Sequence, residues 1–259
     1  MKAMSLVFDF DIDKVKATGR FWADKVYSRI PKDIFGYSAA SYATFVEQNP
    51  NIPLIIYTND VEMIKERMGQ YNVNLSSVSY MDIGEKISEW RKHWFAFNSI
   101  LEWQMYTDDP NEYLIRIDND LIWKAPLPTN INQERDIFVW KYERMVREGN
   151  PKMGEILVCQ TVLNNVDFKE YNIGTLGLPK NYPMKEFYDI TNQMIDVDIF
   201  PVSDLGVHVW HVCEQTAHSW MIHKYNYNII ETYPFVEHWY EDKLMCIQRA
   251  KRLLKQWTL

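Results

Sequence analysis

The sequence has few cysteines, and they are not spaced as in a disulfide-rich or zinc-binding protein. Three cysteines occur among 259 residues, at positions 159, 213 and 246, and no C-x-x-C motif is present. Disulfide-stabilised domains use an even, closely patterned set of cysteines, and structural zinc sites use closely spaced pairs. We therefore expect no disulfide framework and no zinc cluster, and the pattern indicates a reducing compartment.

Signals for membrane insertion or secretion are also missing. No stretch approaches the roughly 20 apolar residues that a transmembrane helix requires. Residues 1–10 are too short and too acidic for a signal peptide. We expect a soluble, cytoplasmic protein of bacterial or viral origin, unless an anchor has been trimmed from the chain.

An excess of positive charge is absent, since the net charge is −7. Proteins that bind nucleic acids usually depend on positive charge to attract the phosphate backbone. We therefore expect no nucleic-acid partner. A single nucleotide held through a metal ion is still compatible with this charge.

The composition is otherwise that of a globular protein with a substantial core. Apolar residues make up 47% of the chain and charged residues 24%, and the length suits one large domain or two small ones. No internal repeat or low-complexity linker divides the sequence, which favours one domain. Aromatic residues reach 15%, and their flat rings suit the faces of sugars as well as a protein core.

The first half of the chain alternates apolar runs typical of strands with segments typical of helices. The expected strands cover residues 3–10, 53–57, 77–81 and 113–117, and the expected helices cover residues 37–48, 61–69 and 83–105. This alternation predicts an α/β fold with a mostly parallel sheet covered by helices on both faces. In such sheets, ligands bind beyond the carboxyl ends of the strands.

The second half of the chain is more mixed. Strands are expected at residues 136–142, 156–163, 171–178 and 229–236, and helices at residues 184–195 and 214–224. Residues 143–154 are highly charged and contain two glycines and a proline. This composition predicts a mobile loop that closes over a ligand or contacts the acceptor.

The most informative feature is the triplet Asp118-Asn119-Asp120, which lies between two apolar runs, Tyr113–Ile117 and Leu121–Trp123. The first run predicts a buried strand, and the triplet is its exit. Two carboxylates about 4 Å apart repel each other by roughly 4 kcal/mol at an effective dielectric constant near 20. A divalent cation removes this cost, and Mg²⁺ and Mn²⁺ prefer such oxygen ligands. The alternative is a solvated turn at an ordinary strand end.

An apolar strand followed by Asp-x-Asp and a second apolar segment resembles the metal site of GT-A fold, nucleotide-sugar-dependent glycosyltransferases. The resemblance implies one GT-A-like (Rossmann-like) domain over residues 1–259, with a nucleotide-binding half in residues 1–125 and a sugar and acceptor half in residues 126–259. It also implies that Asp118 and Asp120 hold Mn²⁺ or Mg²⁺ against the donor diphosphate. A UDP-sugar is the default donor, and the acceptor is a glycan or another hydroxyl compound.

Other segments resemble the donor contacts of these enzymes. The resemblance implies that Tyr57, Thr58 and Asn59 contact the nucleoside, that Arg91 contacts the diphosphate or nucleotide, and that Asn172 and Gly174 border the donor sugar. Glycine lets the backbone approach a ligand closely. The structural alternatives are a strand end followed by a helix cap at Asp60, a solvated helix face at Arg91, and a β-bulge at Asn172–Gly174.

The segment Cys213–His218 resembles the acidic helix start found late in these enzymes. This makes Glu214 the candidate catalytic residue, as the base toward the acceptor or, in retaining members, as the acid below the anomeric carbon. A hydroxyl nucleophile must lose a proton during attack, and a carboxylate within hydrogen-bond reach can accept it. The alternative is an acid that favours the dipole at a helix N-terminus.

Two residues near the C-terminus complete the predicted site. The resemblance implies that His238 is a third metal ligand and that Lys243 contacts the diphosphate, although a lone histidine is usually a structural or surface group. In residues 243–259, apolar positions alternate with lysines and arginines. Packing against the domain is the commoner explanation of this pattern, and peripheral docking on a membrane surface is the alternative.

Two other functions compete with the glycosyltransferase. Leu6–Asp11 resembles the first motif of HAD-type phosphatases, in which Asp9 would attack phosphate and Asp11 would transfer protons. The Gly-Thr that continues this motif is replaced by Ile12-Asp13, and no later acidic pair has the expected context. A non-catalytic carbohydrate-binding protein also agrees with the aromatic content. We favour a metal-dependent glycosyltransferase, either a hexosyl- or a pentosyltransferase.

Overall fold

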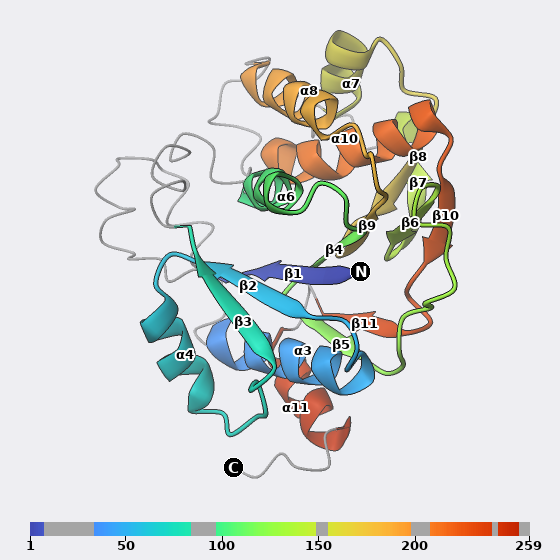
Figure 1. The fold of residues 1–259 in the computed structure, drawn as a ribbon. Helices are drawn as coiled ribbons and strands as arrows, with labels where there is room; N and C mark the ends of the chain where they lie inside the picture. Colours follow the sequence, from blue (N-terminus) through green and yellow to red (C-terminus); the bar gives the residue numbers. More distant parts are fainter. Residues whose placement is uncertain (8–33, 84–96, 149–154, 198–207, 240–242, 254–259) are drawn as a thin grey trace, which may run out of the picture. The chain divides into compact units, whose positions relative to one another are not determined.

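The computed structural model describes residues 1–7, 34–83, 97–148, 155–197, 208–239 and 243–253. Contacts within the chain group the residues into two compact units, whose elements are drawn in Figure 1. The first unit contains residues 1–88, 115–131 and 232–259, and the second contains residues 89–114 and 132–231. Each unit is thus assembled from separate segments, whereas the two halves implied by the resemblance are continuous. The assignment of one domain stays a prediction.

The first unit is built around parallel strands. The strands β1 (Lys2–Leu6), β2 (Leu54–Thr58), β3 (Val78–Asp82) and β4 (Leu114–Ile117) lie in the order β3-β2-β1-β4. β1 pairs in parallel with β2, and β2 pairs in parallel with β3. β1, β2 and β4 are buried with little alternation, which is typical of strands in a parallel sheet. The predicted α/β fold is confirmed.

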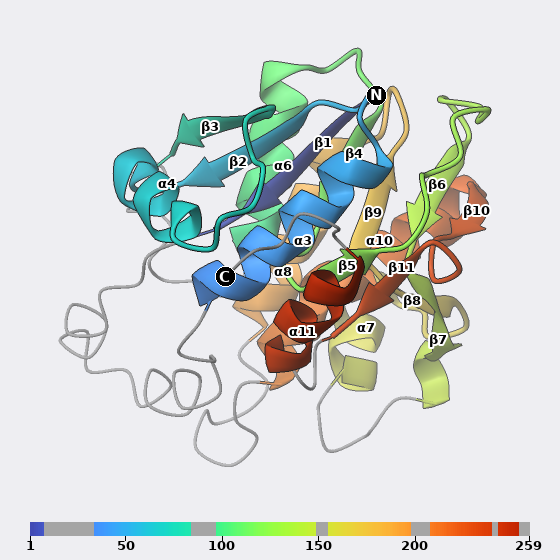
Figure 2. The same cartoon turned by 90° about the horizontal axis from the view of Figure 1, so that it is seen from below.

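Two helices lie on one face of these strands in Figures 1 and 2, α3 (Ile34–Gln48) and α4 (Val61–Gly69). The buried residues of α3 include many small side chains, which let its backbone lie close to neighbouring elements. α4 has the predicted bounds. Asp60 caps it by accepting a hydrogen bond of 3.0 Å from the backbone N–H of Met63.

The C-terminal residues belong to the first unit. β11 (Val236–His238) pairs antiparallel with β5 (Leu121–Trp123), and α11 (Lys243–Leu253) follows. Figure 2 shows α11 beside α3. α3, β5 and α11 share a cluster of buried side chains, namely Tyr37, Ala40, Ile122, Cys246 and Ala250. The apolar side of α11 therefore packs inside the first unit, as the commoner explanation of its sequence predicts.

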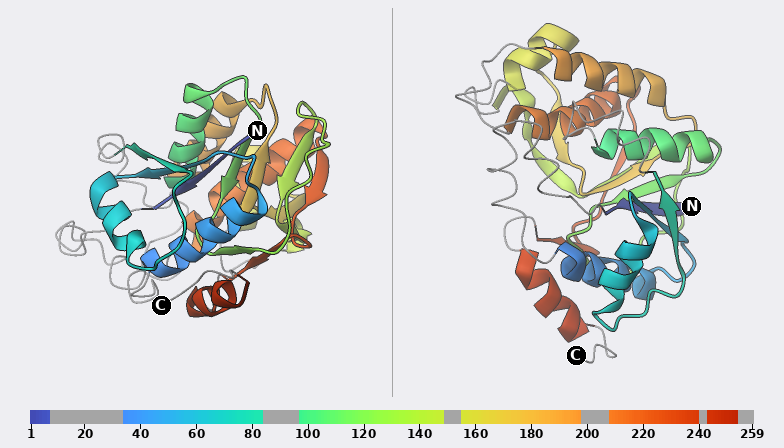
Figure 3. Two further views of the ribbon diagram at one scale, coloured as in Figure 1. Left: turned by 60° about the horizontal axis from the view of Figure 1, so that its bottom comes forward. Right: turned by 90° about the vertical axis from the view of Figure 1, so that its left-hand side faces the viewer.

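The second unit combines helices with paired strands. Its described helices are α6 (Phe97–Asp108), α7 (Glu155–Leu163), α8 (Met184–Asp196) and α10 (His208–Tyr225), with a 3-10 helix at Val146–Glu148. Its strands are β6 (Asp136–Val139), β7 (Lys141–Met145), β8 (Lys169–Asn172), β9 (Thr175–Leu178) and β10 (Asn228–Glu231). β10 pairs in parallel with β6, and β7 pairs antiparallel with β8. Figure 3 shows α8 packed beside α10.

Several strand predictions in the second half of the sequence are wrong. Residues 156–163 form helix α7, because a short apolar run carries no period that distinguishes a buried strand from a buried helix. The other three predicted strands are each divided in two, as β6 and β7, β8 and β9, and β10 and β11. Turn residues such as Gly174 and Pro234 interrupt two of these runs.

Two further predictions concern segments that the structure describes only in part. The predicted mobile loop at residues 143–154 begins instead with the end of β7 and the 3-10 helix, while residues 149–154 lie outside the described residues. The helix predicted at residues 83–105 is found only from Phe97 onward, as α6, since residues 84–96 are not described. None of the helices that the structure describes is both long enough and apolar enough to cross a membrane.

An ion pair between α8 and the end of α10 provides a pH-dependent test of the second unit. Glu186 accepts hydrogen bonds from Lys224 Nζ and from the hydroxyl of Tyr225. Partial burial raises the pKa of Glu186, but these two hydrogen bonds outweigh it and lower the pKa below its ordinary value of 4.5. We expect Glu186→Gln to reduce the free energy of unfolding at pH 7 by no more than about 1 kcal/mol, because the groups are partly exposed.

The sign of the pH dependence follows from the lowered pKa. A lowered folded-state pKa stabilises the protein above pH 4.5, and this stabilisation is lost as the pH falls through the folded-state value. The difference between wild type and Glu186→Gln should therefore shrink at acidic pH. Urea unfolding across the pH range checks this, and a difference that stayed constant with pH would contradict it.

Candidate metal site

Two buried strands hold the acidic triplet in place. β4 and β5 are buried along their whole length, and residues 118–120 form the connection between them. Because both strands are fixed in the core, the carboxylates of Asp118 and Asp120 have little freedom to move apart. The side chain of Asp120 is buried, whereas that of Asp118 is 29% exposed. The strand and its acidic exit lie where the sequence predicts them.

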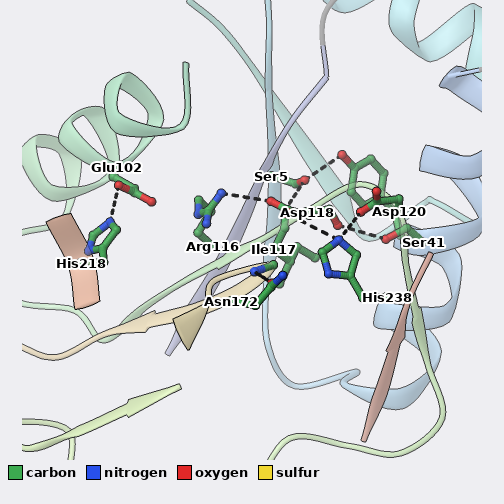
Figure 4. A network of polar contacts seen from close by, with 12 residues as sticks. Ser5, Ser41, Glu102, Arg116, Ile117, Asp118, Asp120, Asn172, His218 and His238 are labelled. Carbon is green, nitrogen blue, oxygen red and sulfur yellow. Dashed lines mark hydrogen bonds and ion pairs between the residues drawn. The ribbon is translucent and has the colours of Figure 1, made fainter. Parts of the chain in front are cut away.

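β11 brings His238 to the acidic triplet, as Figure 4 shows. Its pairing with β5 sets His238 opposite Leu121, the residue that follows Asp120. His238 Nε2 lies 3.1 Å from Asp120 Oδ1 and 3.8 Å from Asp118 Oδ2. One ligand atom from each of the three residues lies within 4.8 Å of the other two. The structure thus brings together the three residues that the resemblance implies as metal ligands.

The donor atoms of this group fit a divalent cation. Two carboxylates at this separation repel when both are ionised, and a cation between them replaces that repulsion with attraction. Carboxylate oxygens suit Mg²⁺ and Mn²⁺, and an imidazole nitrogen suits transition metals. The mixed set of two carboxylates and one imidazole therefore fits Mn²⁺ at least as well as Mg²⁺.

Hydroxyl groups fix the backbone that carries the triplet. Ser5 Oγ donates to the carbonyl of Ile117 at 2.6 Å and itself accepts a 2.8 Å hydrogen bond from Tyr42 OH. Ser41 Oγ donates to the carbonyl of Asp118 at 3.4 Å. Burial raises the pKa of Tyr42 well above its ordinary value, so its hydroxyl keeps the proton that it donates. Two neighbouring carbonyls at the end of β4 are thereby held by side chains of β1 and α3.

The C-terminal segment holds the carbonyl of Asp120. The backbone N–H of Trp239 donates to this oxygen at 3.1 Å, and the thiol of Cys246 in α11 donates to it at 3.2 Å. Because Trp239 directly follows His238, the same segment carries His238 and holds the backbone of the acidic triplet. Nothing in the sequence spacing indicated these contacts, which depend on the pairing of β11 with β5.

Arg116 also belongs to this site, and sequence reasoning did not single it out. It lies in β4, its side chain is only 2% exposed, and its NH1 is 3.0 Å from Asp118 Oδ1. A charged group is almost never fully buried unless it has an opposite charge beside it. An arginine inside the apolar run before the acidic triplet was therefore the signal that could have revealed this ion pair.

The predicted nucleoside contacts lie at the end of β2. Tyr57 and Thr58 are buried, and Asn59 is exposed in the turn that follows. Thr58 Oγ1 accepts a hydrogen bond of 3.3 Å from the backbone N–H of Asp60, so this hydroxyl supports the turn before α4. The helix cap expected as the alternative at Asp60 is present, which leaves Asn59 as the exposed member of the segment.

Other predicted residues lie where the structure gives no side-chain contacts. Asp9, Asp11 and Arg91 lie outside the described residues. Lys243 is the first residue of α11, but its side chain is not among those described. The HAD-type alternative and the two predicted cationic contacts to the diphosphate therefore stay predictions.

In the second unit, Asn172 and Gly174 form a turn between β8 and β9. The backbone N–H of Gly174 donates to Asn172 Oδ1 at 2.9 Å, and the amide of Asn172 donates to Glu143 Oε1 at 2.9 Å. The pairing of β7 with β8 has one irregularity, which lies between Tyr142 and Arg144. The alternative, a bulge at Asn172–Gly174, is not found there, since the irregularity lies in the opposite strand β7. The segment itself is a turn that the side chain of Asn172 supports.

Glu214 lies inside α10, in the second unit. The helix begins at His208, so Glu214 stands more than one turn beyond its N-terminus. The dipole explanation of this acid is therefore wrong, because the dipole effect falls off within the first turn. Glu214 is buried, at 7% exposure, and the next residue, Gln215, donates to Glu143 Oε2 at 3.1 Å and to Glu170 Oε1 at 3.2 Å. The catalytic role of Glu214 stays a prediction.

A second buried polar group in this unit was also missed by sequence reasoning. His218 Nε2 lies 2.7 Å from Glu102 Oε2, and His218 Nδ1 lies 2.8 Å from the hydroxyl of Tyr182. All three side chains are buried, and the ring of Phe187 stacks on that of His218 with the centroids 3.8 Å apart. Figure 4 includes the contact between Glu102 and His218, which links α6 to α10.

Two solved structures similar to this chain are glycosyltransferases. The galactosyltransferase LgtC, in complex with donor and acceptor sugar analogues, matches with a TM-score of 0.53 and 9% sequence identity, over 98% of this chain and 97% of that chain. The apo form of mouse xyloside xylosyltransferase 1 matches with a TM-score of 0.49 and 10% identity, over 89% of this chain and 84% of that chain. No protein-family model and no curated protein sequence matches the chain.

The match to the galactosyltransferase concerns the fold, since so low an identity carries no information about activity. It spans almost the whole length of both chains. It also agrees with the parallel strands of the first unit and with the acidic triplet at the exit of β4. The protein therefore has the GT-A glycosyltransferase fold that its Asp-x-Asp motif predicts.

Proposed function

We propose that the protein is a metal-dependent glycosyltransferase that uses a nucleotide-sugar donor. The observation that carries the proposal is the convergence of Asp118, Asp120 and His238 at the exit of a buried strand in a GT-A fold. These three side chains would hold Mn²⁺ or Mg²⁺ against the diphosphate of the donor. When bound, the cation acts as a Lewis acid that stabilises the charge developing on the leaving diphosphate.

The protein's own side chains would position the donor and move the proton. Asn59, with Tyr57 and Thr58 behind it, would contact the nucleoside, and Arg91 and Lys243 would contact the phosphates. In the second unit, Asn172 and Gly174, at the turn between β8 and β9, would border the sugar. Glu214 would accept the proton of the acceptor hydroxyl or, in a retaining reaction, lie below the anomeric carbon.

The proposed substrates follow from the same resemblance. A UDP-sugar is the donor we favour, and transfer of a hexose or a pentose is equally compatible with the fold. The acceptor would be a glycan or another hydroxyl compound, in line with the sugar analogues bound to the galactosyltransferase that shares the fold. A peripheral membrane contact through α11 would have to use its basic side, because its apolar residues Cys246 and Ala250 are buried in the first unit.

Isothermal titration with UDP, GDP and CDP, each with and without Mn²⁺, tests the proposal. We expect one nucleotide to bind only when Mn²⁺ is present, and that nucleotide identifies the donor class. Asp118→Asn should lose this metal-dependent binding, while Asp189→Asn, which changes an exposed carboxylate of α8, should retain it.

The other outcomes of this titration separate the competing functions. Failure of every nucleotide to bind in the presence of Mn²⁺ would contradict the proposal. Sugar binding without nucleotide binding would then point to a carbohydrate-binding protein, and release of phosphate from phosphate esters would point to the HAD-type alternative.

A further inference from the structure

The carboxylate of Asp118 has two neighbours, the buried guanidinium of Arg116 and the imidazole of His238. The side chain of Arg116 is 2% exposed, and a guanidinium buried to this degree requires an opposite charge. Residues two apart in a strand point to the same face, which places Arg116 beside Asp118 at the end of β4. The two charges lie 3.0 Å apart, within the distance of a charge-assisted hydrogen bond.

The two oxygens of Asp118 face different groups. Oδ1 accepts the hydrogen bond from Arg116 NH1, whereas Oδ2 lies 3.8 Å from His238 Nε2 on the side of the candidate metal site. Figure 4 shows Arg116 and His238 on different sides of this carboxylate. Rotation of Asp118 to present both oxygens to one cation would break the hydrogen bond to a buried arginine.

We infer that Arg116 is a positioning residue that makes Asp118 a one-oxygen ligand and thereby favours small octahedral cations at this site. The inference rests on the proposed binding of a divalent cation by Asp118, Asp120 and His238. Mg²⁺ requires a near-ideal octahedral shell, whereas Ca²⁺ takes six to eight oxygens and often binds carboxylates through both of them. A carboxylate that can give only one oxygen to the cation suits the six-ligand shell of Mg²⁺ better than the larger shell of Ca²⁺.

The charge of Arg116 has a second consequence for the cation. Arg116 offsets one of the two carboxylate charges. Asp118, Asp120 and His238 therefore attract a bare cation less than they would if both carboxylates were uncompensated. A bound diphosphate would add negative charge beside the cation. The cation should therefore bind much more tightly with the nucleotide than without it.

Two variants separate the charge of Arg116 from its shape. Arg116→Met removes the charge and the hydrogen bond, whereas Arg116→Lys keeps a charge but replaces the planar guanidinium by a single ammonium group. Binding of Mn²⁺ without nucleotide is measured by the loss of its EPR signal, and Ca²⁺ is measured by competition. Both measurements are independent of catalysis.

For Arg116→Met we expect Mn²⁺ to bind at least about tenfold more tightly than to wild type, because a neighbouring positive charge has been removed. In both variants we expect the preference for Mn²⁺ over Ca²⁺ to fall about tenfold, because Asp118 can then present both oxygens. Arg147→Met is the matched control, since it removes an exposed arginine that pairs with Asp167 at 2.7 Å, and it should leave both quantities unchanged.

A purely structural role of Arg116 predicts something different. It would lower the melting temperature by the same amount with and without Mn²⁺ and leave cation affinity and preference as in wild type. That result in the folded Arg116→Lys protein would overturn the inference, even if Arg116→Met did not fold. Failure of wild type to bind Mn²⁺ with or without nucleotide would instead contradict the proposed function.

Discussion

The double substitution Asp118→Asn with Asp120→Asn should lower glycosyl transfer by about a thousandfold or more and leave the protein folded. The two carboxylates are the anionic ligands of the candidate site, and their oxygens lie with His238 Nε2 inside one cluster. Loss of the cation would remove several kcal/mol of stabilisation from the charged transition state. About 4 kcal/mol corresponds to a factor of roughly a thousand in rate.

The protein should stay folded because asparagine has nearly the shape of aspartate. The backbone of residues 117–120 would keep its hydrogen bonds from Ser5, Ser41 and Cys246, none of which uses a carboxylate oxygen. Removing two neighbouring carboxylates also removes their repulsion, although Arg116 then loses its ionic partner. These effects oppose each other, so circular dichroism and a thermal melt should show a folded protein with modestly altered stability.

The measurement is initial-rate transfer from the nucleotide sugar that the titration identifies, with Mn²⁺ in excess. Asp189→Asn is the matched control, because it makes the same chemical change at an exposed carboxylate of α8 that pairs with Lys185 four residues away. It should retain the activity of wild type. A folded double variant that transferred sugar at the wild-type rate would show that Asp118 and Asp120 do not hold a catalytic metal.

The first unit could be predicted in most of its elements, because its signals are local. Apolar runs of strand length, turn residues after them and the cap at Asp60 lie within a few residues of one another, and α4 has the predicted bounds. The acidic triplet was recognisable for the same reason. Its position between two buried strands can be predicted from one continuous segment, residues 113–123.

The rest of the site depends on contacts between residues far apart in the chain. His238 reaches Asp120 only through the register of β11 on β5, which no local pattern specifies, so only the resemblance to a family pointed to it. Arg116 lies inside an apolar run that predicts only a buried strand, and the sequence around it does not identify the partner that its charge requires. The helix predicted from the sequence begins at Glu214, whereas α10 begins at His208, so the position of Glu214 within the helix could not be predicted.

The second large effect is expected at the buried contact between Glu102 and His218, which joins α6 to α10. Burial raises the pKa of Tyr182 well above its ordinary value, and the nearby charge of Glu102 raises it further, so the phenol stays protonated. It can then donate to His218 Nδ1, which leaves the proton of the imidazole on Nε2, facing Glu102 at 2.7 Å. Tyr182 thus donates a hydrogen bond to His218, and His218 donates one to Glu102, in a region without solvent.

Replacing one member of the pair should be strongly destabilising. Glu102→Leu leaves the imidazole without its acceptor, and His218→Leu leaves a buried carboxylate without its donor. We expect each to lower the free energy of unfolding by about 3–5 kcal/mol. Tyr182→Phe is the control, since it removes a single hydroxyl and keeps the ring, and it should cost about 1 kcal/mol. Urea denaturation at neutral pH measures all three.

The double variant Glu102→Leu with His218→Leu distinguishes a satisfied polar pair from two independently important side chains. Replacing a buried charged pair by apolar groups of similar volume is often close to neutral, whereas breaking it is not. The double variant should therefore be more stable than the sum of the two single losses predicts, by several kcal/mol. If the single variants fail to fold, the double variant should still fold. Additive losses would show that Glu102 and His218 stabilise the second unit through separate packing contacts, such as the stacking of Phe187 on His218, and not through the bond between them.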